Sequence, residues 1–200
     1  QLFQAELLVG STIVCQQRAP PLRLPPPWRM ILALSTPTKS DYEARLAREQ
    51  SIFADQIEVH ELPQIFHYWS NRYLRPWMEE YGFSNPDQFF ARYLQQAADR
   101  TGTGPARFVS VGCGNCDTEV RVAGLIRQAG MHDFVIECLD INEAMLERGR
   151  QLAIEAGVAE QILPIRADFN RWQPQRQYAA IMANQSLHHV VELEALIAAY

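Results

Sequence analysis

The chain has 200 residues, 48% hydrophobic and 20% charged, a composition typical of globular proteins that excludes a collagen-like fibre or a disordered tail. The formal net charge of -5 argues against broad attraction to nucleic-acid phosphates. No run of about 18 apolar residues occurs, so we expect no membrane insertion. Four cysteines are few for this length, which favours a reducing compartment and a cytoplasmic location.

Residues 1–40 differ in composition from the rest of the chain. Five of the twelve prolines fall between Pro20 and Pro27, a density incompatible with a helix or a central strand. We therefore expect a flexible, proline-rich segment that does not join the core. Met30 is a candidate for the natural start, in which case the preceding residues are not native.

Residues 41–104 show helical periodicity and form a predicted N-terminal helical region. A first apolar face carries four residues at helical spacing: Tyr42, Leu46, Phe53 and Ile57. A second helix begins at Pro63, ends near Pro76 and presents an aromatic stripe that we expect to face the core: Ile65, Phe66, Trp69 and Tyr73. A third begins at the start signal Ser84-Asn85-Pro86.

From residue 105 to residue 200, strands and helices alternate. Strands are predicted at 107–112, 134–140, 162–167 and 178–184, with helices at 117–129 and 142–156 and another from about 191. Asp117 and Asn142 are expected to cap the two complete helices. The fold class is therefore α/β, a Rossmann-like parallel sheet of about four strands with an N-terminal helical extension. Pro164 places the third strand at a sheet edge.

The fourth strand would lie at an unpaired edge, with apolar surface uncovered. We therefore expect the sequence to be a fragment of a longer polypeptide whose missing part supplies further strands.

Polar or glycine residues follow every predicted strand, where ligands bind in open α/β sheets. The first strand leads into a glycine turn, Gly112-Cys113-Gly114, that exposes bare backbone. The third glycine of a dinucleotide fingerprint would fall at Asp117, whose carboxylate would repel a pyrophosphate. This disfavours NAD and favours a ligand with a cationic centre.

The next strand ends offer matching groups. Asp140 could accept hydrogen bonds from both hydroxyls of a ribose. Considered alone, this residue fits equally well as a solvated cap of the next helix. Asp168 beside Phe169 suits the amino edge and the face of adenine. Asn184 and Gln185 follow the fourth strand. We expect these four loops to converge in one crevice.

The region from Phe108 to Val191 resembles the class I S-adenosylmethionine-dependent methyltransferases. The matching segments are VSVGCGNCDTE, LDINEAMLERGR, RADFN and ANQSLHHV. The resemblance implies S-adenosyl-L-methionine as cofactor and a pocket in which glycines border its amino acid part, one acid holds the ribose and other residues contact adenine or lie near the sulfonium. The cofactor-binding residues expected on this basis are Gly112, Cys113, Gly114, Asp117, Asp140, Ile141, Met145, Asp168, Phe169, Asn184 and Gln185.

The predicted reaction is methyl transfer by in-line displacement to a small-molecule, lipid or natural-product acceptor. His188 or His189 could accept a proton from the acceptor. Arg72, on a helix that would close over the site as a lid, could pair with the cofactor carboxylate. The absence of an Asn-Pro-Pro-aromatic tetrad argues against a nucleic-acid acceptor. The alternatives are a non-catalytic cofactor-binding or scaffold module and an NAD-dependent oxidoreductase.

Cys113 and Cys116 form a C-x-x-C pair. A structural zinc site needs four ligands, and the sequence has no second such pair. We therefore expect small residues packing a tight turn and no metal.

Overall fold

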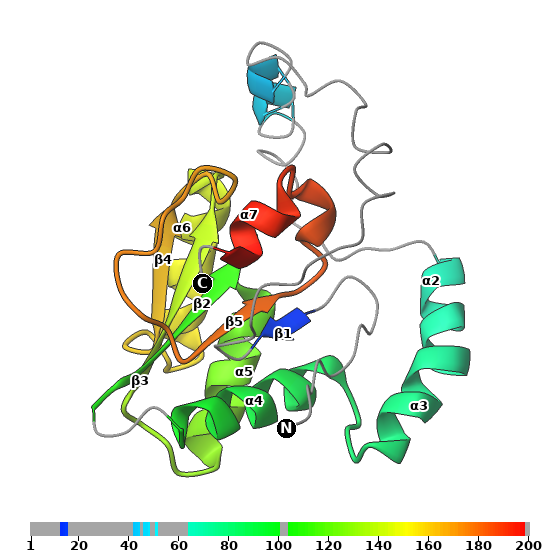
Figure 1. Cartoon of the computed structure of the whole chain (residues 1–200). Coiled ribbons are helices and arrows are strands. Elements are labelled where there is room, and N and C mark those ends of the chain that lie inside the picture. Colours follow the sequence, from blue (N-terminus) through cyan, green and yellow to red (C-terminus); the bar gives the residue numbers. More distant parts are fainter. Residues whose placement is uncertain are drawn as a thin grey trace, which may run out of the picture.

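The computed structural model describes residues 13–15 (backbone only), 42–44, 46–48, 51, 64–100 and 104–198. A five-stranded sheet with the order β1-β5-β2-β3-β4 lies at its centre (Figure 1). The strands are β1 (Ile13–Cys15), β2 (Ala106–Val111), β3 (Phe134–Asp140), β4 (Ile162–Arg166) and β5 (Ala180–Ala183).

Strands β2 to β5 run parallel to one another, which confirms the predicted Rossmann-like sheet. Phe108 on β2 pairs with Ile136 on β3 on one side and with Ala180 on β5 on the other. Buried parallel strands are mostly apolar, and β2 and β3 follow this pattern with one buried polar residue each, Ser110 and Glu137. Strand β4 lies at the sheet edge, as its proline, Pro164, indicates.

Strand β1 differs from the sequence expectation. It comes from the segment expected to stay outside the core and pairs antiparallel with β5, with Ile13 opposite Ala183. The fourth parallel strand is therefore paired on both sides. Three residues carry too little periodicity to be recognised as a strand, and their partner lies about 170 positions along the chain. The stretch Pro20 to Pro27 lies outside the described residues.

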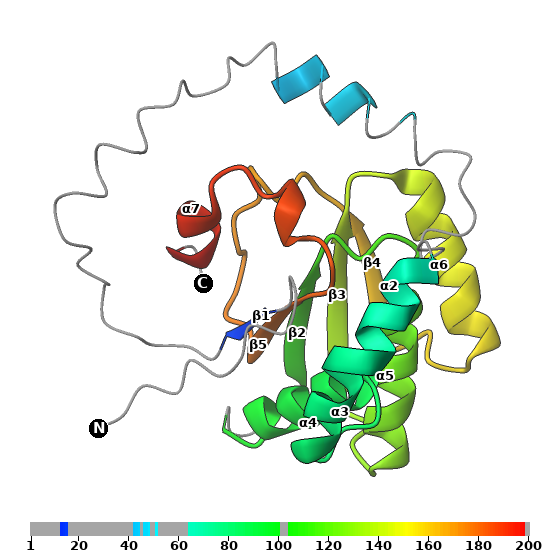
Figure 2. The same ribbon diagram turned by 90° about the vertical axis from the view of Figure 1, so that its right-hand side faces the viewer.

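Three helices cover one face of the sheet: α4 (Pro86–Ala98), α5 (Asp117–Gln128) and α6 (Glu143–Glu155). Their apolar residues form one core with the strand residues that point to this side, including Phe108, Ile136 and Met182. Helices α4 and α5 pack directly against each other, and Figure 2 shows both beside the lower half of the sheet.

The other face is covered by the chain between β4 and β5 and by the last described helix. Val109 and Leu139 contact the buried Tyr178 there. The short helix η3 (Leu187–His189) and α7 (Leu193–Ala198) bring Leu196 against Val111 and Phe169. Both helices lie at the carboxyl ends of the strands, at the upper end of the sheet in Figure 2.

Local signals place the helix starts. The Asn85 side chain caps α4, and that of Asn142 caps α6 by accepting from the backbone N–H groups of Ala144 and Met145, as predicted. The cap predicted at Asp117 is wrong by one residue. Asp117 is the first residue of α5, and Cys116 occupies the cap with a positive φ of 59° and no side-chain cap bond.

The aromatic helix runs further than predicted and is less buried. It consists of α2 (Gln64–Trp69), a π-helical turn η2 (Ser70–Leu74) and α3 (Arg75–Glu80). A proline clashes with the carbonyl four residues earlier, and the wider π turn lets the helix continue through Pro76. The stripe is not core, since Ile65 is 65% and Trp69 49% exposed. Figure 1 shows α2 standing to the side of the sheet.

Of the first predicted helix, residues 42–44 and 46–48 are helical, so Tyr42 and Leu46 are described. Phe53 and Ile57 lie outside the described residues. Within the described ranges, every helix is too short or too polar to cross a membrane.

Candidate functional site

The glycine turn after β2 is held against the end of β3. Gly112 has a φ of +69° and donates its N–H to the Leu139 carbonyl at 2.8 Å. Gly114 has a φ of +57° and donates its N–H to Oδ2 of Asp140 at 2.9 Å. Both angles lie in the left-handed region that favours glycine. Backbone N–H groups of the turn after β2 therefore bind the carboxyl end of β3.

The Asp140 carboxylate joins two loops. Its Oδ1 accepts from the Asn142 N–H at 2.9 Å, while Oδ2 binds Gly114. Burial raises the pKa of Asp140 above its ordinary value, and the backbone N–H groups of Asn142 and Gly114 oppose that shift by stabilising the charged form. Ile141 beside it is half-buried, and Met145 is buried.

The loops after β4 and β5 contact the same glycine turn. A Cβ built on Gly112 would lie 2.5 Å from the Ser186 Cβ and 3.5 Å from Cε1 of Phe169. A Cβ on Gly114 would lie 3.2 Å from Cε of Met145. The Ser186 hydroxyl donates to the Val111 carbonyl. The structure thus brings all four predicted loops together at one edge of the sheet.

Asp168 lies at the centre of a polar cluster after β4. Its Oδ1 accepts from the Tyr42 hydroxyl at 2.6 Å and from the Asn170 N–H at 3.1 Å. Arg171 Nε approaches Oδ2 at 3.6 Å. Asn170 Nδ2 in turn donates to the His189 carbonyl at 3.2 Å, and Asn170 Oδ1 accepts from the Val191 N–H at 2.7 Å. The loops after β4 and β5 are therefore tied together.

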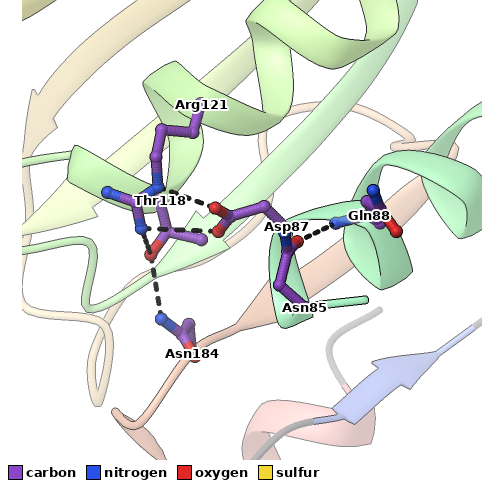
Figure 3. A network of polar contacts seen from close by, with 6 residues as sticks. All are labelled: Asn85, Asp87, Gln88, Thr118, Arg121 and Asn184. Carbon is purple, nitrogen blue, oxygen red and sulfur yellow. Dashed lines mark hydrogen bonds and ion pairs between the residues drawn. The ribbon is translucent and has the colours of Figure 1, made fainter. Parts of the chain in front are cut away.

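Asn184, at the end of β5, belongs to a network that reaches α4 (Figure 3). Its Nδ2 donates to Thr118 Oγ1 at 3.0 Å, and Arg121 donates to the same oxygen at 3.4 Å. Arg121 Nε also donates to Asp87 at 2.7 Å. A chain of side chains thus fixes the orientation of the Asn184 amide.

Three thiols cluster below the glycine turn. The Sγ atoms of Cys113 and Cys116 are 3.6 Å apart, and Cys138 from β3 contacts both. All three are buried and free. Hydrogen bonds from its two neighbours lower the pKa of Cys116 to about 5, while burial raises the pKa values of Cys113 and Cys138. The described residues contain no group of three or more side chains arranged to hold a metal ion.

Glu119 is a buried acid next to this cluster. Ser110 Oγ donates to its Oε1 at 2.6 Å, and its Oε2 has no hydrogen-bond partner among the described residues. Burial, with a contribution from Cys116, raises the pKa of Glu119 to about 8. At neutral pH this carboxyl is therefore largely protonated.

The remaining candidates lie in η3, in the loop after β5 and in η2. His188 is exposed and His189 half-buried in η3, with ring centroids 3.9 Å apart. Gln185 is exposed, with a φ of +55°. The Arg72 guanidinium lies over the rings of Tyr68 and Tyr73 in its own helix, so its described ring contacts do not connect it with the four loops.

Sequence reasoning missed three contributors to the site: Tyr42, Asn170 and Ser186. Ser186 and Asn170 lie inside two of the segments that the sequence predicts as ligand loops, and their polar side chains are the available signal. The periodicity places Tyr42 on an apolar helix face, and its bond to Asp168 spans 126 positions in the sequence. Local patterns carry no information on such a contact.

The family model described as the ubiE/COQ5 methyltransferase family matches residues 63–171, more than half of the chain. Among curated proteins, no match is found.

Several solved structures are similar. The 4+2 cyclase SpnF is 24% identical, with 55% of this chain and 39% of that chain covered and a TM-score of 0.42. An S-adenosylmethionine-dependent methyltransferase from Thiobacillus denitrificans, in complex with S-adenosylhomocysteine, is 19% identical, with 58% of this chain and 41% of that chain covered and a TM-score of 0.35. A putative S-adenosylmethionine-dependent methyltransferase from Methanococcus maripaludis is 17% identical, with 55% of this chain and 48% of that chain covered and a TM-score of 0.41. The chain spans less than half the length of each.

Proposed function

Since the chain belongs to the ubiE/COQ5 methyltransferase family, we propose that it binds S-adenosylmethionine at the carboxyl ends of β2 to β5 and takes part in methyl transfer. The acceptor is a small molecule, a lipid or a natural-product intermediate. The observation that carries this proposal is the meeting of four strand ends around Gly112 and Asp140.

The residues at this edge fit the cofactor. The Gly112 and Gly114 Cα atoms carry no side chains where a ligand must approach the backbone. Two carboxylates, Asp140 and Asp168, offer acceptors, and no phosphate has to be bound. Asn142 Nδ2, buried beside Asp140, has no hydrogen-bond partner among the described residues and can donate to a ligand acceptor.

Asp140 binds the ribose in this proposal. Each carboxylate oxygen already accepts one backbone N–H, which fixes the rotamer of the side chain. A carboxylate has about four acceptor positions, so about two remain for the hydroxyls. Asp168 accepts from the adenine amino group, Phe169 lies at its face, and Met145 and Ile141 supply apolar contacts. Gly112, Cys113, Gly114 and Asp117 border the amino acid part.

The bound cofactor supplies an electrophilic methyl group on a sulfonium. The protein has to hold the acceptor in line with this group and exclude water, because alignment alone supplies much of the rate. Asn184 and Gln185 lie nearest the reacting centre in this proposal, with the Asn184 amide fixed by Thr118. His188 or His189 accepts the proton of a hydroxyl or ammonium acceptor.

Incorporation of a labelled methyl group tests the proposal. The full-length protein is incubated with methyl-labelled S-adenosylmethionine and, separately, with a lipid extract and an aqueous metabolite extract. We expect the wild type to incorporate label into one of the two extracts and Asp140→Ala to incorporate none. Asp133→Ala, an exposed aspartate at the other end of β3, is the matched control and should retain full incorporation. Cofactor binding without incorporation in either extract would favour a non-catalytic binding module.

Arg72 needs its own test, because its ring contacts lie within its own helix. If it pairs with the cofactor carboxylate, Arg72→Ala should weaken S-adenosylmethionine binding severalfold. An unchanged dissociation constant would remove Arg72 from the site.

A further inference from the structure

Tyr42 reaches the proposed adenine site from a distant part of the chain. Its hydroxyl donates to Asp168 Oδ1 at 2.6 Å, and the Arg171 guanidinium lies 4.7 Å from its ring centroid. Two independent contacts, one polar and one with the ring, therefore hold Tyr42 against the loop after β4.

The two carboxylate oxygens of Asp168 have different partners. Oδ1 accepts from the Tyr42 hydroxyl and from the Asn170 N–H. Oδ2 is approached by Arg171 Nε at 3.6 Å, which is too long for a good hydrogen bond. Oδ2 can therefore still accept a hydrogen bond, while the bonds to Oδ1 fix the carboxylate plane.

Tyr42 remains a donor over the whole physiological pH range. Burial and the hydrogen bond to Asp168 raise the pKa of Tyr42 to about 12. The phenol therefore keeps its proton and donates it in the hydrogen bond to Asp168 Oδ1.

We propose that Tyr42 is a positioning residue for the cofactor: its hydroxyl orients Asp168 so that Oδ2 accepts from the exocyclic amino group of adenine. This inference rests on the proposed function, since it assigns adenine to Asp168. It places Tyr42 itself, in addition to any contribution of Arg72, against the adenine end of the site.

Calorimetric titration of the full chain with two ligands tests the inference. S-adenosylhomocysteine carries the adenine amino group, and S-inosylhomocysteine has an oxygen in its place. Tyr42→Phe keeps the ring over Arg171 and removes only the hydroxyl. We expect S-adenosylhomocysteine to bind Tyr42→Phe about three- to tenfold more weakly than wild type, the range of one hydrogen bond. S-inosylhomocysteine should bind both proteins equally.

Two controls separate positioning from folding. Tyr81→Phe removes the hydroxyl of an exposed tyrosine whose ring packs on Trp77, and it should leave both dissociation constants unchanged. In an Asp168→Asn background, Tyr42→Phe should have no further effect on S-adenosylhomocysteine binding, because the two residues act as one unit.

The outcomes distinguish this inference from the function on which it rests. If the wild type does not bind S-adenosylhomocysteine, the proposed function fails. If it binds, but Tyr42→Phe binds equally well or loses affinity for both ligands to the same degree, only the role of Tyr42 is overturned.

Discussion

Gly112 and Ser186 are packed so closely that no side chain fits between them. A Cβ on Gly112 would lie 2.5 Å from the Ser186 Cβ and 3.2 Å from its Oγ. The Ser186 hydroxyl is turned toward the Val111 carbonyl, so its position is set by β2 itself. This contact joins the turn after β2 to the loop after β5, so the carboxyl ends of these two strands belong to one site.

Gly112→Ala should disturb this junction. The added methyl group overlaps Ser186, and the residue has a φ of +69°, which alanine rarely adopts. Overlap in a packed interior costs about 1–3 kcal/mol, and the left-handed backbone adds roughly 1–2. Urea unfolding should therefore show a loss of stability of at least about 2 kcal/mol, the combined minimum of those ranges.

Two further variants check the cause. Gly124→Ala in α5 meets nothing within 4 Å and should be neutral or stabilising by up to about 1 kcal/mol, because it only improves helix propensity. Ser186→Gly in the Gly112→Ala background should restore part of the lost stability by removing the clashing Cβ. Absence of any restoration would mean that backbone strain, and not contact with Ser186, explains the loss.

Glu119 should make stability depend on pH. Its pKa is about 8 in the folded protein and near 4.5 when exposed, so the folded state holds this proton more tightly. The resulting stabilisation is complete below about pH 4.5 and is lost as the pH rises through 8. Compared with Glu119→Gln, which keeps an acceptor for Ser110, the wild type should lose stability at up to about 1.4 kcal/mol per pH unit within this window. Parallel pH profiles of the two proteins would contradict the burial of an acid there.

Thr118 should matter through its hydroxyl. Thr118→Val keeps the shape but leaves the Asn184 amide and Arg121 without their shared acceptor (Figure 3). We expect a stability cost of about 1–3 kcal/mol and slower methyl transfer, whereas Thr118→Ser should behave like the wild type. Unfolding curves and labelled-methyl rates measure the two effects. Equal rates in all three proteins would show that orientation of Asn184 is unimportant.

The parts of the fold that local sequence determines could be predicted. The side chains of Asn85 and Asn142 act within three residues of their own positions, so the starts of α4 and α6 follow from the sequence. The bounds of β3 also follow from local sequence, because its own mostly apolar residues mark where the strand begins and ends. The position of Asp140 at a strand end then follows, because parallel strands place their carboxyl ends at one edge.

The parts that depend on distant contacts could not be predicted. The pairing of Ile13 with Ala183 and the bond from Tyr42 to Asp168 join segments more than 120 positions apart. The π turn before Pro76 was missed for another reason: a proline ordinarily predicts a helix end, and only the widened turn removes its clash. The exposure of Trp69 shows that periodicity identifies an apolar face but not whether that face is covered.

Calorimetric titration with S-adenosylmethionine tests the central claim most directly. The account predicts one cofactor per chain, with no heat from NAD, and a loss of at least about tenfold in affinity for Asp140→Ala, since hydrogen bonds to a charged group are each worth about 1.5–3 kcal/mol. Asp133→Ala should bind like the wild type. Equal affinities in wild type and Asp140→Ala would contradict a site built at these four strand ends.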